Sequence, residues 1–145
     1  MRHPTALTVV AWVTVLAVAG CRGAAPKPAP VPSQIIWRSV GSWSGRGDSQ
    51  TDSFTSDSGA LRIRWQTTAG PPKTVDGSFR LTARSAISGR ELEQAVDQRG
   101  PGNGTAYVSQ DPHVFYMSVE SSGLDWTFSV EEGIAGQVVG ADPPR

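Results

Sequence analysis

The chain has 145 residues, and its 13 Lys and Arg residues balance its 13 Asp and Glu residues. This balance argues against a nucleic-acid-binding protein, because affinity for a phosphate backbone depends on a marked basic excess. With one Cys and two His residues, the chain cannot form an internal disulfide and has little with which to build a zinc site or a Ser-His-Asp triad, so we expect no metal, no cofactor and no catalytic residue.

The first 20 residues have the pattern of a cleaved export signal. Arg2 provides the positive flank, and residues 6–20 form an uncharged, mainly apolar run. The run is shorter than the roughly 20 residues that a membrane-spanning helix needs. It therefore predicts the hydrophobic region of a signal peptide, which is removed from the mature protein.

The apolar run ends at Val18-Ala19-Gly20-Cys21, which places an aliphatic residue and two small residues before the only cysteine. This site resembles the lipobox of bacterial lipoprotein precursors, with Val18 where the family prefers Leu. The resemblance covers residues 1–21. It implies cleavage between Gly20 and Cys21, a diacylglyceryl thioether on Cys21, and acylation of the new amino terminus by a fatty acid such as palmitate.

The lipobox resemblance also implies a location. A diacylglyceryl group supplies the two chains that stable anchoring requires, so we expect an extracytoplasmic protein attached by its lipid to the cell membrane or the outer membrane. The alternative is an ordinary secretory signal that is cleaved after Ala17-Val18-Ala19 and leaves Gly20 as the mature start. That alternative gives no reason for the single thiol of Cys21.

Residues 21–34 predict a linker between the anchor and the folded domain. Proline occupies every second position from 26 to 32. Each proline fixes its own φ and pushes the preceding residue toward an extended conformation. The segment should therefore be a stiff, polyproline-like spacer that reaches up to roughly 40 Å.

Residues 35–132 predict a single all-β domain. Four clear runs alternate apolar and polar side chains, which is typical of strands with one buried face; they are residues 61–65, 79–84, 115–120 and 126–131. Weaker strand candidates are residues 35–43, 49–56 and 104–109. About seven or eight short antiparallel strands with frequent turn signals indicate a β-sandwich or a jelly-roll-like fold.

Three segments of this domain need a further decision. Residues 91–96 contain helix-forming side chains, but their short length and flanking glycines favour a strand. Residues 115–120 and 126–131 predict an antiparallel hairpin around Gly123, with its inward side chains at Phe115, Met117, Val119, Trp126, Phe128 and Val130. The Gly- and Pro-rich residues 133–145 predict a flexible tail, with one further short strand over 137–139 as the alternative.

The polar faces of two predicted strands suggest a binding surface. If residues 60–67 and 78–85 are neighbouring strands, their alternation points Arg62, Arg64, Arg80 and Arg84 outward together. Like charges at this spacing repel unless acidic side chains such as Glu120 and Glu131, or an anionic partner, neutralise them. The face is then either a solvated surface or a patch that meets an anionic surface or an acidic envelope protein.

Other candidate sites are weaker. Asp48, Asp52 and Asp57 do not have the spacing of a calcium-binding EF-hand loop, and such side chains more often cap turns. Trp65 and Trp126 are in phase with apolar neighbours and predict core positions. Trp43, flanked by serines, is the tryptophan that we expect to be available for stacking on a sugar.

Together these features predict a membrane-anchored lipoprotein whose domain is a non-enzymatic binding or interaction module of the cell envelope. Its partners would be the membrane, through the lipid, and an envelope protein, an anionic surface or a glycan, but not nucleic acid. The alternatives are a carbohydrate-binding module and an envelope hydrolase that uses carboxylates only. The hydrolase would require two carboxylates that converge in a pocket.

Overall fold

The computed structural model describes residues 33–71 and 76–137. The predicted signal peptide, Cys21, almost all of the predicted linker and residues 138–145 lie outside the described residues. Within this part of the chain no helix could cross a membrane, and the regular structure is entirely β, as the sequence predicts. The strands are β1 (Ser33–Arg46), β2 (Ser49–Gln50), β3 (Phe54–Ser56), β4 (Ala60–Ala69), β5 (Ser78–Ser85), β6 (Glu91–Arg99), β7 (Gly102–Ser109), β8 (His113–Ser122) and β9 (Leu124–Gln137).

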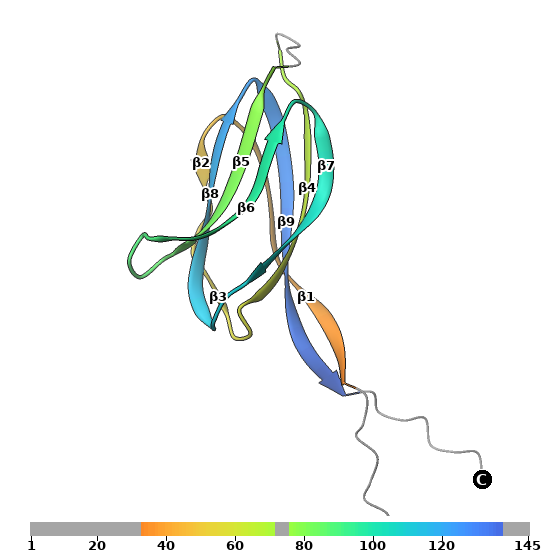
Figure 1. Ribbon diagram of the computed structural model, residues 1–145, viewed down its shortest axis with the longest axis vertical. Helices are drawn as coiled ribbons and strands as arrows, with labels where there is room; N and C mark the ends of the chain where they lie inside the picture. The colour runs from red at the N-terminus through yellow and green to blue at the C-terminus, as the bar shows by residue number, and fades with distance from the viewer. Residues whose placement is uncertain (1–32, 72–75, 138–145) are drawn as a thin grey trace, which may run out of the picture. The chain divides into compact units, whose positions relative to one another are not determined.

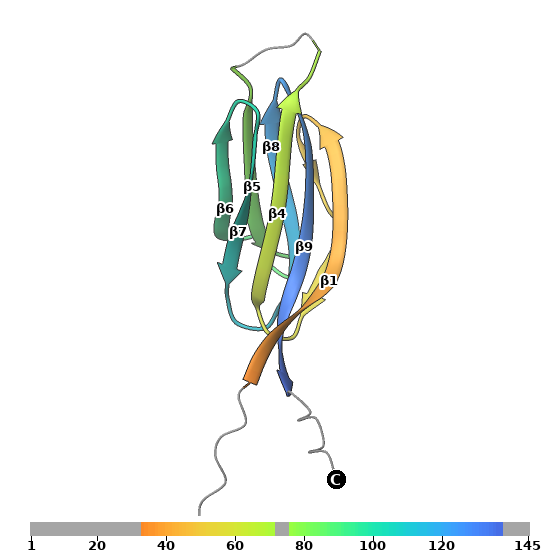
Figure 2. The same cartoon turned by 90° about the vertical axis from the view of Figure 1, so that its right-hand side faces the viewer.

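The strands form two antiparallel sheets that face each other (Figures 1 and 2). Sheet A has the order β1-β9-β4-β7, and sheet B has the order β2-β8-β5-β6, with β3 also paired to β8. Residues 91–96 lie in β6, which confirms the prediction of a strand there. These two facing sheets confirm the predicted β-sandwich.

The order of pairing is that of a jelly roll. β1 pairs with β9, β2 and β3 pair with β8, β4 pairs with β7, and β5 pairs with β6. This is one long antiparallel ribbon folded over on itself, and it closes into two sheets because β9 also pairs with β4 and β8 with β5. The jelly roll is normally built from eight strands, and here β2 and β3 together fill one of the eight positions.

The last two strands were predicted to pair as a hairpin, and this pairing is wrong. The prediction of which of their side chains point inward is confirmed. β8 and β9 are consecutive but lie in different sheets. Gly123, with φ of 70°, connects them at the point where the chain passes between the layers. All six side chains predicted to point inward are at most 4% exposed. Alternation determines which face of a strand is buried, but it does not select the strand's partner.

The core between the sheets contains stacked aromatic rings. Trp43 stacks on Phe128 with 5.3 Å between ring centroids, and Trp126 lies 6.3 Å from Phe79. Trp126 is 4% exposed and donates a hydrogen bond from Nε1 to the carbonyl of Gly47 at 2.9 Å. Trp43 therefore faces the core, and its ring is not the free stacking surface that the sequence suggested.

The predicted tail begins too early, because β9 continues to Gln137. Residues 133–137 pair with the start of β1, from Ser33 opposite Gln137 to Trp37 opposite Gly133, and the two strand ends form a ribbon at one end of the sandwich (Figure 1). A Cβ on Gly133 would lie 3.1 Å from the Trp37 ring. The glycine that suggested a loop instead makes room for a large side chain, and the strands of the domain extend from Ser33 to Gln137.

A buried carboxylate on β9 forms hydrogen bonds to β1 and to the segment at the end of β3. Glu132 is 0% exposed. It accepts hydrogen bonds from Ser56 Oγ at 2.8 Å and from the Ser58 backbone N–H at 3.0 Å, and it pairs with Arg38 of β1. Burial by itself raises the pKa of this carboxyl, but the hydrogen bonds from Ser58, Ser56 and Arg38 outweigh it and lower the pKa from 4.5 to about 2. Glu132 is therefore ionised in the folded protein near neutral pH.

Candidate functional site on the outer face of sheet A

The four arginines predicted as one patch lie on two separate faces. Arg62 and Arg64 belong to β4 in sheet A, whereas Arg80 and Arg84 belong to β5 in sheet B. The assumption that these two strands are neighbours is wrong, because the chain passes from one sheet to the other after β4. The two outer faces therefore have to be considered one at a time.

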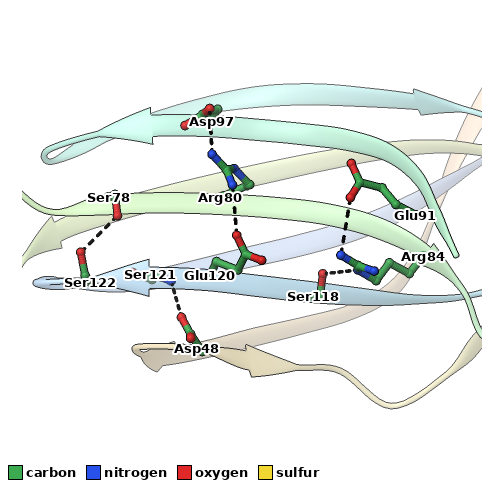
Figure 3. Close-up of polar contacts among 10 residues, drawn as sticks. All are labelled: Asp48, Ser78, Arg80, Arg84, Glu91, Asp97, Ser118, Glu120, Ser121 and Ser122. Atoms are coloured by element: carbon green, nitrogen blue, oxygen red, sulfur yellow. Dashed lines mark hydrogen bonds and ion pairs between the residues drawn. The ribbon is translucent and has the colours of Figure 1, made fainter. Parts of the chain in front are cut away.

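On the outer face of sheet B, Arg80 and Arg84 are paired with carboxylates (Figure 3). Arg80 lies between Glu120 at 3.2 Å and Asp97 at 3.6 Å. Arg84 reaches Glu91 at 3.5 Å. Asp97 and Glu120 are 52% and 59% exposed and share one guanidinium, so they do not form a carboxylate pair in a water-excluded cleft. Arg80 and Arg84 therefore have acidic partners on their own sheet.

Asp48 has a structural role at the edge of the same sheet. Its Oδ1 accepts a hydrogen bond from the Ser121 backbone N–H at 2.8 Å (Figure 3). In the two described ranges, no group of three or more His, Cys, Asp or Glu side chains is arranged to hold a metal ion. Asp48, Asp52 and Asp57 accordingly do not converge.

A serine and the histidine of the domain also lie in contact, in the arrangement of a nucleophile and its base. Ser85 Oγ is 2.7 Å from His113 Nε2, but Ser85 is 2% exposed. Its oxygen also accepts the backbone N–H groups of Ile87 and Ser88 at 3.3 and 3.2 Å. The hydroxyl is thus enclosed in the turn after β5, where a substrate carbonyl cannot approach it. The pair holds that turn against β8.

One end of the outer face of sheet A carries an aromatic and charged cluster. Arg62 Nε donates to Glu131 Oε2 at 2.7 Å, and its guanidinium carbon lies 4.4 Å from the centroid of the Trp37 ring. The ring of Tyr107 lies 6.0 Å from that of Trp37 and is 61% exposed. The hydrogen bond from Arg62 lowers the pKa of the Glu131 carboxyl. Arg62 is therefore held in place by a carboxylate and by a cation–π contact.

The other end of this face is closed by a second ion pair. Arg46 Nε, on β1, donates to Asp125 Oδ1 of β9 at 2.6 Å. The hydrogen bond from Arg46 lowers the pKa of the Asp125 carboxyl. These two charges balance each other, so this end of the face adds no net charge.

Between these two ends lies a shallow, open hollow of about 640 Å³. Its polar side chains come from two successive outward positions on all four strands and form two rows across the sheet. One row is Ser42, Ser129, Arg64 and Thr105, and the other is Ser44, Thr127, Gln66 and Asn103. Among the described residues, no hydrogen bond occupies the seven neutral side chains of these rows, in contrast to the paired groups of sheet B.

Arg64 is the charged member of the two rows. It is 59% exposed and lies 3.5 Å from Glu131, whose closer partner is Arg62 at 2.7 Å. One carboxylate therefore faces two guanidinium groups. The hollow has a net charge of about one positive unit beside Arg64, directed at solvent.

The sequence identifies part of this site. Arg62 and Arg64 were candidates; Arg64 lines the hollow and Arg62 lies at one end of it. Trp37 and Tyr107 were not candidates. Tyr107 alternates with Thr105 and Asn103 along β7, and this phase could have identified it as an outward aromatic residue. The neutral Ser, Thr, Asn and Gln side chains have no such signal, because register alone brings them together.

The chain matches no protein-family model, and no curated protein matches its sequence. The jelly-roll fold by itself does not determine an activity. Only the chemistry of the two outer faces therefore bears on function.

Proposed function

We propose that the protein is a lipid-anchored, non-enzymatic binding module of the bacterial cell envelope, and that it binds its ligand on the outer face of sheet A. The observation that carries this proposal is the difference between the two faces. On the outer face of sheet B, Arg80 and Arg84 pair with carboxylates, and Ser78 pairs with Ser122. In sheet A the two central rows line a hollow, and their neutral side chains are available to a ligand.

The size and composition of the hollow support ligand binding. Ligand sites commonly have volumes of about 300–1,000 Å³ and a few well-placed polar groups, and the hollow has about 640 Å³. Its floor is a four-stranded sheet whose opposite face packs on the core, so the backbone that carries the polar groups is rigid. A rigid site loses little conformational entropy when it binds.

The proposed anchor is Cys21, and its replacement gives the first prediction. The variant Cys21→Ser should not incorporate fatty acid and should accumulate as an unprocessed or released form, because a serine hydroxyl does not provide the sulfur of the thioether. Metabolic labelling with an alkynyl fatty acid, followed by membrane fractionation, measures this. A wild-type protein that takes up no label would contradict the anchoring proposal.

The binding face can be tested by photo-crosslinking in intact cells. A photoreactive amino acid in place of Thr105, on edge strand β7 of sheet A, should give crosslinked products. The same amino acid in place of Gln94, on edge strand β6 of sheet B, is the matched control, since both positions are exposed. Products from the Gln94 position alone, or equal products from both positions, would contradict the assignment of the site to sheet A.

A further inference from the structure

We propose that the hollow of sheet A binds an acidic oligosaccharide, and that Arg64 contacts a carboxylate on one of its sugars. This inference rests on the proposed function and names the class of ligand for the same face. It depends on three features of the outer face of sheet A: the neutral polar rows of the hollow, the net charge beside Arg64, and the exposed ring of Tyr107.

The neutral rows match the chemistry of a sugar chain. Ser and Thr hydroxyls both donate and accept hydrogen bonds, and Asn and Gln side chains also supply both functions, as do the hydroxyls of sugars. Neighbouring strands lie about 4.8 Å apart, and the two rows are about 6.7 Å apart along the strands. The result is a regular array of donors and acceptors. Figure 2 shows the four adjacent strands that carry it. An apolar ligand would leave these groups unpaired, at a cost for each one.

The charge of the hollow favours an anionic sugar. Arg62 and Arg64 share the carboxylate of Glu131, and Arg62 is the better paired and the less exposed, at 18% against 59%. Arg64 is therefore the guanidinium that is available to a carboxylate of the ligand, with the planar fork that suits this group. A single excess charge among neutral groups fits a sparsely charged glycan and is too little for nucleic acid.

Tyr107 provides a stacking surface at the edge of the array. It lies two residues from Thr105 on β7, about 6.7 Å along the strand, and is 61% exposed. The negative face of an aromatic ring attracts the C–H groups that line one side of a sugar ring. The Trp37 ring is partly covered by Arg62, so Tyr107 is the residue that we expect to stack on the ligand.

The test compares acidic oligosaccharides with the same oligosaccharides after methyl esterification, which removes the charge and keeps the sugars and linkages. The panel contains oligogalacturonides, hyaluronan oligomers and glycan strands of peptidoglycan. Each is titrated calorimetrically into the full-length lipoprotein in detergent micelles. At least one acidic form should bind about 10- to 100-fold more tightly than its ester, which is the range for a hydrogen bond to a charged group.

Three variants test which residues cause the difference in affinity between the acidic oligosaccharide and its ester. Arg64→Gln should reduce the affinity for the acidic form to that for the ester, and raised salt should act in the same direction. Tyr107→Ala should weaken binding of both forms by a similar factor. Arg80→Gln, on sheet B, is the matched arginine control and should change neither affinity.

Several results would overturn the inference. They are equal affinity for acid and ester, a preference that survives Arg64→Gln, or binding of no member of the panel. A protein crosslinked at the Thr105 position, together with no glycan binding, would overturn the glycan inference and leave the proposed face intact. Loss of selective crosslinking at Thr105 would overturn both.

Discussion

Replacing Glu132 with Gln should lower the free energy of unfolding by about 3 kcal/mol, because each hydrogen bond to a buried charged group contributes about 1.5–3 kcal/mol. The carboxylate accepts hydrogen bonds from Ser56, Ser58 and Arg38. A Gln amide would place an N–H₂ group against some of these donors and would leave the Arg38 charge without its partner. Urea denaturation followed by tryptophan fluorescence measures the loss.

The control for Glu132→Gln is Glu120→Gln, because Glu120 pairs with Arg80 at the surface and is 59% exposed. Exposed ion pairs contribute about 0–1 kcal/mol, so this variant should unfold close to the wild type. Equal effects of the two substitutions would show that the buried carboxylate of Glu132 has no special role.

The same carboxyl makes the stability of the domain sensitive to acid. The pKa of Glu132 is about 2 in the folded protein against its ordinary value of 4.5, so the unfolded chain binds this proton at a higher pH than the folded protein does. The stabilisation is therefore complete above about pH 4.5 and is lost as the pH falls toward about 2, by about 3 kcal/mol in total. Glu132→Gln should flatten this part of the pH profile.

Replacing Trp126 with Ala should also lower the free energy of unfolding by about 3–5 kcal/mol, as expected for a large buried aromatic side chain. The indole is 4% exposed, lies 5.7 Å from the Phe128 ring, and donates to the Gly47 carbonyl. For a domain of this size the loss corresponds to a decrease in Tm of more than about 10 °C, which calorimetry measures.

The control for Trp126→Ala is Tyr107→Ala, which removes an aromatic side chain that is 61% exposed and should change Tm by only a few degrees. A Trp126→Ala protein that melts within a few degrees of wild type would contradict the buried position of the indole. It would also make Trp126 available for stacking on a ligand.

Alternation predicts the buried faces because it is a local property of each strand. Leu61 and Ile63 of β4, and Phe115 and Met117 of β8, all point inward as predicted. Pairing is not local: β1 and β9 lie at opposite ends of the domain sequence, and Arg38 and Glu132 are 94 residues apart. The predicted hairpin and the predicted single arginine patch each assumed a strand pairing that the sequence pattern does not determine. Both predictions were wrong.

The candidate site was predictable only where a residue type has a strong preference. Arg62 and Arg64 attract attention because charged side chains mark the outer face of a strand. Gln66 and Asn103 do not, since isolated amides are common in turns and on surfaces. They become part of a binding surface only through the register that places them opposite each other in β4 and β7.

The pairing of β1 with β9 also determines how the domain would respond to mechanical force. The two strands are antiparallel neighbours, so the chain enters at Ser33 and leaves β9 at Gln137, which face each other in the register. Tension between these two ends would separate the pairs one after another, as in unzipping. Tension between Ser33 and a ligand held across sheet A would instead load the β1–β9 pairs between Ser33 and the hollow in shear. If the proposed lipid anchor and the proposed ligand site are both correct, a bound ligand would load the domain along this stronger path.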